Sequence, residues 1–529
     1  MHLILKHLED PKAYARLLFV DFSSAFNTIH PHLLIDQMKQ LSVNPCIIKW
    51  YYSFLIDRIQ CVKVNNLLSY QKSSSTGVPQ GCVSSPILFT LFTNECLSRI
   101  YDGRLPILMV TDLEMIKAIM VKECYSTFTN RRVSLAGPFA DGITVVKDER
   151  WKRIRSSLSP YFTSGRLKEI FPIAVTHADR FIKNMQKRDH EQPVKVKEVV
   201  APYSLDVVTS SSFSVDIDSI NNADDPFVTN VKKFFKFSLF SPLILILTLF
   251  PSVANLLGKM GISLFSRSSV DFFYNVLRKI KDEHNKESNG RVDFLKLMIQ
   301  NQIPDEKFED TSDQPVKGLT DHEILSQSFV FILGGYETTS TTLTYLLYNL
   351  ATNPDCLEKL VVEIDTNFPS DTPITYDALM KMDYLEMAIN ESMRLLPTAP
   401  RLERVCKKTV ELNGVTIPKD TLVGIPTYVL CHDPQLWESP DEFRPERFSP
   451  ESKSEMNQYG FMPFGLGPRN CIGMRFAQMI MKLLVLKLLQ NFSMETCKET
   501  QIPLELNAIF QPKVPITLKF IPRSCKAKE

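Results

Sequence analysis

One cysteine lies in a glycine-rich segment, Phe464-Gly465-Leu466-Gly467-Pro468-Arg469-Asn470-Cys471-Ile472-Gly473. Gly465 and Gly467 permit a tight backbone path, and Gly473 permits close approach of a flat ligand. Cys471 precedes a predicted helix, whose free N–H groups and dipole favour a thiolate. Such a thiolate can be a proximal haem ligand that promotes O–O cleavage, with Arg469 clamping a haem propionate. The alternative is a small buried side chain without chemistry.

A second candidate lies inside a long predicted helix, at Gly334-Gly335-Tyr336-Glu337-Thr338-Thr339. Glycines weaken a helix, so the pair needs a reason, and a local opening beside a ligand is one. Thr338 would then offer a hydroxyl to that ligand. The alternative is that its hydroxyl bonds back to the preceding helical turn.

The elements that position these residues are mainly helical. Thr320 and Glu323 form a capping box that predicts the start of the long helix, and Asn353-Pro354 predicts its end. Asn413-Gly414 predicts a hairpin between 408–412 and 415–418. We also expect helices over 354–364, 384–395 and 474–489 and strands over 106–110 and 514–520.

The composition predicts a large folded chain without a global bias toward nucleic acid. Its 529 residues are 44% hydrophobic and 23% charged, with a net charge of +2; disorder and collagen-like repeats are excluded. The eleven cysteines are scattered without a Cys-x-x-Cys pair, which indicates a reducing compartment and argues against a disulfide framework or zinc site. No transmembrane helix or signal peptide is evident. Phe234–Val253 is the most apolar segment, either a buried helix or a surface that enters a membrane.

The cysteine loop resembles the haem-binding loop of cytochromes P450, and further motifs follow in that family's order. Glu391-Ser392-Met393-Arg394 and Pro445-Glu446-Arg447-Phe448 resemble its Glu–Arg–Arg network. The sequence of residues 99–529 is specifically similar to that of subfamily 3A, whose members oxidise steroids and drugs. The resemblance implies the P450 fold, mainly α with minor β sheets. It also implies the following site residues: Thr338 and Glu337 as the proton relay, Cys471 as the iron ligand, and Arg469, Phe464, Trp151, Arg155, Arg131 and Arg404 as haem-binding residues.

The resemblance further implies haem b as the cofactor, with O2 and NADPH-derived electrons as co-substrates. The implied partners are a lipophilic substrate and NADPH–cytochrome P450 reductase, with cytochrome b5 as a second electron donor; we expect no nucleic acid. In the subfamily, the counterpart of Phe234–Val253 lies near the substrate entrance, and this favours its contact with a membrane surface. The implied location is the cytoplasmic face of the endoplasmic reticulum membrane, although no counterpart of the family's N-terminal anchor is found in the sequence.

Residues 14–96 resemble the palm region of non-LTR retrotransposon reverse transcriptases, a partial α/β fragment. The matching segments are Phe19–Phe26, which contains Asp21, and Gly77–Pro86. Polymerase chemistry needs paired carboxylates that hold two metal ions. The expected aromatic-x-Asp-Asp motif does not follow Pro86, so we expect no polymerase activity.

We therefore expect two domains, a truncated and inactive reverse-transcriptase-like fragment over 1–98 and a haem-thiolate monooxygenase over 99–529. One alternative is a non-catalytic retroelement fusion that does not retain haem. The other is a fragment of an RNA-directed DNA polymerase. Haem content separates the first alternative from the monooxygenase, and the missing second carboxylate motif argues against the other.

Overall fold

The computed structural model describes residues 34–35, 38–39, 45–55, 58–60, 63–64, 67–68, 72–74, 99–102, 105–132, 137–235, 243, 246, 257, 265–286, 293–304, 318–369, 372–507 and 510–523. The chain divides into two compact units, Met1–Ser98 and Arg99–Glu529. In the first unit, the structure describes α3 (Pro45–Leu55) and two short antiparallel pairs. These pairs are β1 (Arg58–Gln60) with β4 (Lys72–Ser74), and β2 (Lys63–Val64) with β3 (Leu67–Leu68).

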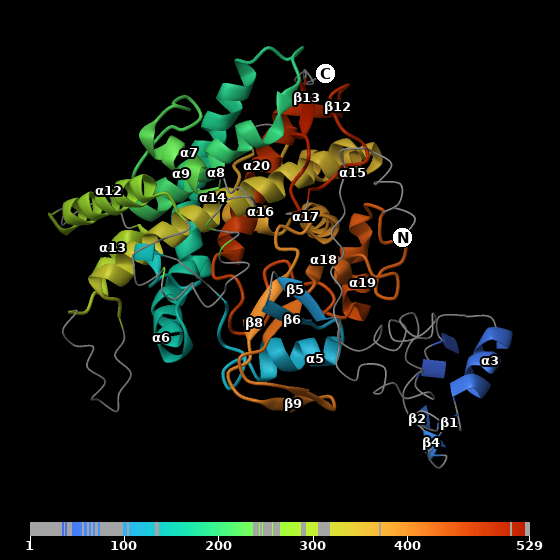
Figure 1. Ribbon diagram of the computed structural model, residues 1–529. Coiled ribbons are helices and arrows are strands. Elements are labelled where there is room, and N and C mark those ends of the chain that lie inside the picture. Colours follow the sequence, from blue (N-terminus) through green and yellow to red (C-terminus); the bar gives the residue numbers. More distant parts are fainter. Residues whose placement is uncertain are drawn as a thin grey trace, which may run out of the picture. The chain divides into compact units, whose positions relative to one another are not determined.

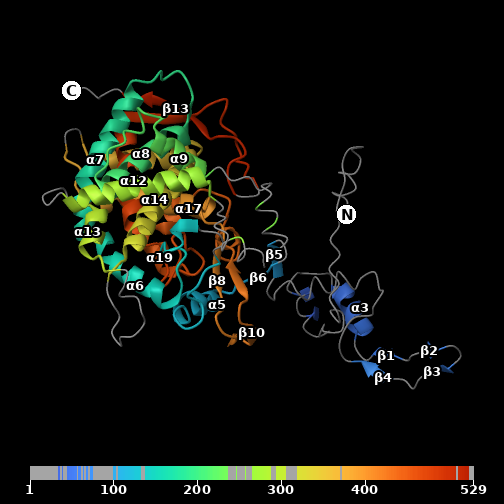
Figure 2. The ribbon, with the colours of Figure 1, turned by 60° about the vertical axis from the view of Figure 1, so that its left-hand side comes forward.

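The second unit is mainly helical (Figures 1 and 2). Its helices are α5 (Leu113–Lys117), η2 (Ala118–Lys122), η3 (Gly137–Phe139), α6 (Asp148–Leu158), η4 (Ser159–Phe162), α7 (Ser164–Gln186), α8 (Val196–Phe213), α9 (Pro226–Phe234), α12 (Arg267–Lys286), α13 (Phe294–Gln300), α14 (Asp321–Ala351), α15 (Pro354–Asn367), α16 (Tyr376–Met380), α17 (Asp383–Leu395), α18 (Thr427–Cys431), η6 (Pro445–Phe448), α19 (Pro450–Glu455) and α20 (Met474–Asn491).

The described residues of this unit also form three small sheets. The strands β5 (Arg99–Asp102), β6 (Leu105–Met109), β11 (Leu422–Ile425) and β8 (Leu402–Val405) form one sheet in that order. Another contains β12 (Phe492–Thr496), β13 (Thr517–Pro522) and β7 (Val194–Lys195). The hairpin predicted at Asn413-Gly414 is confirmed, because β9 (Val410–Leu412) pairs antiparallel with β10 (Val415–Ile417) around it.

Helix α14 is the central element of the unit, with α8 beside it in both ribbon views. Helix α20 also contacts α14, and α7 packs against α8 and α20. The predicted capping box is present, since the Thr320 hydroxyl accepts from the Glu323 amide while the Glu323 carboxylate accepts from the Thr320 amide. Most residues of α8 and of the second halves of α14 and α20 are buried, as expected for helices inside a large core.

The two adjacent glycines of α14 have different surroundings. A Cβ on Gly335 would lie 2.3 Å from Val208 Cγ2, so this glycine lets α8 pack closely against α14. A Cβ on Gly334 would meet nothing within 4 Å. Helix α14 runs unbroken from Asp321 to Ala351, and packing at Gly335 explains one of the two glycines. An opening beside a bound ligand stays a prediction.

Candidate functional site

The cysteine loop is a tight turn that leads into α20. Gly465 and Gly467 have φ angles of +72° and +69°, so both occupy the left-handed region that glycine adopts without strain. The Cys471 amide donates to the Phe464 carbonyl at 2.8 Å, and the Asn470 amide donates to the Gly467 carbonyl at 3.2 Å. These bonds fix the Cys471 backbone just before α20 begins at Met474. The predicted tight backbone path is confirmed.

Gly467 also fixes the loop against a second element, η2. A Cβ at this position would lie 2.0 Å from the Met120 carbonyl oxygen. Only glycine allows the two backbones to approach so closely. The loop is therefore positioned both by its own hydrogen bonds and by backbone contact with η2.

Three arginines predicted to bind haem gather beside this loop, although they come from distant parts of the chain. The Arg131 guanidinium donates to the Arg469 carbonyl at 3.0 Å, Arg469 donates to the Val146 carbonyl at 2.9 Å, and Arg404 donates to the Glu403 carbonyl at 2.8 Å. Arg404 and Arg469 are almost completely buried. Within the described part of the chain, none of the three forms an ion pair with a carboxylate.

The buried positive charges of this cluster favour the binding of an anion. Burial is the main cause, and the nearby charge of Arg131 the second, that together lower the pKa of Arg404 to about 10 and that of Arg469 to about 9. Two nitrogens of each buried guanidinium, Nε and Nη2 of Arg404 and Nε and Nη1 of Arg469, have no hydrogen-bond partner among the described residues. Buried donors of this kind are costly unless paired. The cluster therefore fits a ligand that carries more than one carboxylate.

Trp151 and Arg155 lie one helical turn apart on α6, as predicted. The Arg469 guanidinium lies over the Trp151 ring, 4.8 Å from its centre, so this buried indole supports the arginine cluster. Arg155 donates to the carbonyl and side-chain oxygens of Asn470, both at 2.8 Å. The structure thus brings α6 directly against the cysteine loop.

Two opposing effects act on the Cys471 thiol. Part of the residue surface is open, yet protein atoms crowd the thiol, and this burial raises its pKa above the usual value. The Gly473 amide and the charges of Arg155 and Arg131 act in the opposite direction without outweighing burial. The amide at the helix start therefore favours the thiolate, as predicted, but burial outweighs it. A bound metal ion would supply what is missing, because it deprotonates a coordinating thiol.

Glu337 and Thr338, the predicted proton relay, point to different partners. The Thr338 hydroxyl donates to the Gly334 carbonyl at 2.5 Å, the backbone contact that sequence reasoning gave as the alternative, but the residue remains exposed. The Glu337 carboxylate pairs with Lys197 of α8 at 2.5 Å. In the described structure, the two side chains do not hydrogen-bond to each other.

The Glu–Arg–Arg network forms behind the cysteine loop as predicted. Arg394 makes two hydrogen bonds to Glu391, at 2.8 and 2.9 Å, and both residues are fully buried. Arg447 donates to the same carboxylate at 3.2 Å. Arg394 also donates to the carbonyls of Cys431 and Pro440, so the network ties α17 to the segment before the loop.

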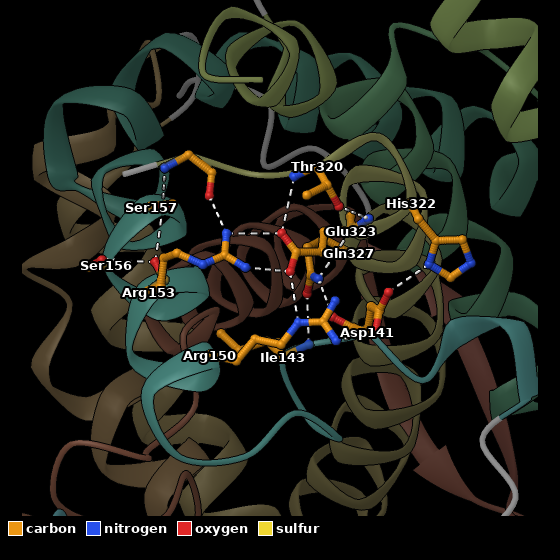
Figure 3. Close-up of polar contacts among 11 residues, drawn as sticks. Asp141, Ile143, Arg150, Arg153, Ser156, Ser157, Thr320, His322, Glu323 and Gln327 are labelled. Carbon is orange, nitrogen blue, oxygen red and sulfur yellow. Dashed lines mark hydrogen bonds and ion pairs between the residues drawn. The ribbon is translucent and has the colours of Figure 1, made fainter. Parts of the chain in front are cut away.

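Sequence reasoning missed two polar partners of the site helices. Lys197 carries no motif, and only the fold brings it to Glu337. Glu323 is known from its capping box, but its carboxylate also binds Arg153 and Arg150 of α6, at 2.5 and 2.9 Å (Figure 3). The i,i+4 spacing of Trp151 and Arg155 predicts that these two side chains share one face of α6. No pattern in the sequence predicts that Arg153 pairs with Glu323.

Several sequence predictions lie outside the described residues. These are the reverse-transcriptase-like segments with Asp21, and all but a few residues of Phe234–Val253. No helix among the residues that the structure describes is long and apolar enough to cross a membrane.

Comparison with known proteins gives two family matches. Residues 93–520 match the model of the cytochrome P450 family, and residues 1–115 match that of reverse transcriptase (RNA-dependent DNA polymerase). The chain is 52% identical over 451 residues to cytochrome P450 3A40 of Oryzias latipes, covering 83% of this chain and 89% of that protein. It is 53% identical over 442 residues to cytochrome P450 3A27 of Oncorhynchus mykiss (82% and 85% covered). Identity to cytochrome P450 3A29 of Sus scrofa is 50% over 429 residues (80% and 84% covered).

Proposed function

We propose that this chain, which belongs to the cytochrome P450 family and is a monooxygenase of the 3A type, oxidises large lipophilic substrates such as steroids and xenobiotics. The observation that supports the site most directly is the group of buried arginines beside the cysteine loop. Haem b carries two propionates, and this matches a cluster that lacks carboxylate partners among the described residues.

Cys471 would hold the haem iron, and Arg131, Arg155, Arg404, Arg469 and Trp151 would hold the propionates, with Phe464 packed beside the thiolate. When bound, haem supplies the redox chemistry that puts one atom of O2 into the substrate and reduces the other to water. The contribution of the protein is to orient the thiolate, to neutralise the propionates and to keep water away from both. The domain boundary that we propose is residue 99, with an inactive fragment before it.

Glu337 and Thr338 would deliver the protons that the reduction of O2 consumes. The Thr338 hydroxyl would turn away from the Gly334 carbonyl, to which it now donates a hydrogen bond. It would then give its proton to the O2 that is being reduced. The Glu337 carboxylate would turn away from Lys197 Nζ, take up a proton from water, and pass that proton to the Thr338 oxygen. Both movements are side-chain rotations at the surface of an unbroken helix. They leave the backbone of α14 unchanged.

NADPH–cytochrome P450 reductase would supply electrons on the Cys471 side, with cytochrome b5 as a second donor. We place the protein at the cytoplasmic face of the endoplasmic reticulum membrane, with Phe234–Val253 as its membrane contact. The similarity to 3A enzymes supports this placement. Sedimentation with microsomes before and after a high-salt wash tests it, and recovery of the chain in the supernatant without any wash would contradict it.

The carbon monoxide difference spectrum of the reduced full-length chain tests the central proposal. We expect a strongly red-shifted Soret band that Cys471→Ser abolishes. The matched control is Cys431→Ser, because Cys431 is a buried thiol outside the site. A less shifted band in the unaltered chain would mean that haem binds without the thiolate. No band at all would favour the non-catalytic alternative.

A further inference from the structure

One side chain from the first turns of α14 makes two hydrogen bonds to the backbone of the segment 137–147. The Gln327 carboxamide oxygen accepts from the Ile143 amide at 2.7 Å, and its nitrogen donates to the Asp141 carbonyl at 2.7 Å (Figure 3). Gln327 is fully buried. Because both partners are backbone atoms, this clip fixes the path of the segment whatever side chains it carries.

Other contacts hold the same segment in the same place. The rings of Phe139 and Phe329 are stacked with their centres 3.7 Å apart. A Cβ on Gly142 would lie 2.6 Å from Val330 Cγ2, so the backbone of the segment touches α14 there. The Asp141 carboxylate contacts His322 at 2.7 Å and Arg150 at 2.8 Å. Gln327 is the only one of these α14 residues that binds the segment through two backbone atoms.

The position of Gln327 on α14 connects the segment to the proposed reaction. Gln327, Phe331, Gly334 and Thr338 follow one another at spacings of four, three and four residues. Residues with these spacings share one face of a helix. At 1.5 Å per residue, Gln327 lies roughly 10 Å from Gly334 along that face. Gln327 therefore holds the segment against the beginning of one face of α14. Gly334 and the Thr338 hydroxyl lie farther along that same face.

We propose that Gln327 is a positioning residue that sets which carbon of a large substrate is oxidised, by holding segment 137–147 against α14. This inference rests on the proposed function. Gln327 touches neither reacting atoms nor substrate in this role. It acts through the backbone of Asp141 and Ile143, and the segment in turn limits how a long, rigid molecule lies along the face that ends at Thr338.

The test compares Gln327→Met with Ser328→Ala in the full-length chain. Methionine has nearly the volume of glutamine but makes neither backbone bond, so the core stays filled. Ser328 is the matched control, because it is buried at the next position of α14 and, among the described residues, its hydroxyl bonds only to the Ile324 carbonyl of the same helix. Gln327→Glu is the second variant; it keeps the acceptor for Ile143 and loses the donor to Asp141.

Two measurements are needed, and one of them does not require haem. Amide hydrogen exchange over 139–147 should become roughly tenfold faster in Gln327→Met, the effect of losing two buried hydrogen bonds, and should not change in Ser328→Ala. With progesterone as the probe, the ratio of hydroxylated products should shift several-fold in Gln327→Met at an unchanged carbon monoxide band. A ratio of products does not depend on how much enzyme carries haem.

Unchanged exchange over 139–147 would overturn the clip. Faster exchange with an unchanged product ratio would overturn the link to regiochemistry and leave Gln327 a purely structural residue. If Gln327→Met does not fold, Gln327→Glu decides by the same two criteria. A parent chain without a carbon monoxide band would instead refute the proposed function, a result distinct from either of these, because the exchange measurement reports on the clip alone.

Discussion

Arg131, Arg404 and Arg469 bring positive charge into a region that excludes water, and burial is the main cause of the lowered pKa of all three. A cluster of this kind weakens the fold while it is unpaired and strengthens ligand binding once an anion arrives. Removing one of these arginines should therefore stabilise the haem-free chain and weaken its retention of haem.

Arg404→Met tests this opposition. We expect haem to leave roughly ten- to a hundredfold faster, because a hydrogen bond to a charged group contributes about 1.5–3 kcal/mol. The haem-free chain should become more stable, since a buried charge is removed. Haem transfer to excess apomyoglobin and thermal unfolding without haem measure the two effects. Arg401→Met is the control, because Arg401 is half-exposed and pairs with Glu403. Lower stability of the haem-free Arg404→Met chain would contradict the argument.

Thr338 should control how many of the consumed electrons reach the product. Thr338→Ala removes the hydroxyl, and a positioned proton donor contributes about 10²–10⁴-fold. We expect product formed per NADPH to fall by at least tenfold while hydrogen peroxide rises. Thr338→Ser keeps a hydroxyl at the same atom and should retain most of the coupling. Equal coupling in the alanine variant and the parent would assign Thr338 only its helical hydrogen bond to Gly334.

At the scale of elements, the sequence predicts caps and turns well, but it predicts contacts between distant residues poorly. The capping box at Thr320 and the Asn413-Gly414 turn are determined by neighbouring residues, and both form as expected. The pKa of Cys471 depends on everything packed around the loop, which no local pattern contains. The pairing of Lys197 with Glu337 is likewise a product of the fold, because it joins two helices far apart in the chain.

Gly467→Ala should displace the cysteine loop from η2. The new Cβ would meet the Met120 carbonyl at 2.0 Å, so backbone must move. Gly414→Ala is a matched control for strain alone, because Gly414 has a similar φ of +76° but open space around it. The left-handed backbone costs alanine about 1–2 kcal/mol at either position. We expect the carbon monoxide band to be largely lost in Gly467→Ala and kept in Gly414→Ala. Equal bands in both variants would refute the role of the contact with η2.

Glu323 joins α6 to the start of α14, and its contribution should depend on pH. Burial raises the pKa of Glu323, but hydrogen bonds from Arg153, the Thr320 amide and Arg150 outweigh it, so the net shift is downward from 4.5. A carboxyl with a lowered pKa stabilises the fold above its unfolded pKa and loses that contribution as the pH falls through the folded value.

Glu323→Gln should therefore lower the urea midpoint strongly at pH 7 and progressively less below pH 4.5. Urea unfolding at pH 7, 5 and 3.5 measures the trend. Glu169→Gln is the control, because Glu169 is exposed on α7 and pairs only with nearby Arg166 among the described residues. A loss that stays constant with pH would mean that the carboxylate charge contributes nothing beyond hydrogen bonding.

At the scale of the whole molecule, the proposed site belongs to a single unit. Its residues run from Arg131 to Cys471, inside the unit that begins at Arg99. The first strand of that unit, β5, pairs with β6, which pairs in turn with β11. Every strand neighbour in this sheet therefore comes from residues after 98. The reverse-transcriptase match over 1–115 extends past this boundary without supplying any of the proposed haem ligands.

Cleavage of the full-length chain at a protease site inserted directly before Arg99 tests this independence. We expect the carbon monoxide band to keep its position and intensity after cleavage, because no proposed haem contact and no strand pair of the second unit is cut. The same insertion without protease controls for the added residues, and gel filtration shows which fragment carries the haem. If the band collapses on cleavage, residues 1–98 support the haem domain and the boundary at 99 is not a domain boundary. If it persists on the larger fragment, the retroelement-like unit is dispensable for haem binding.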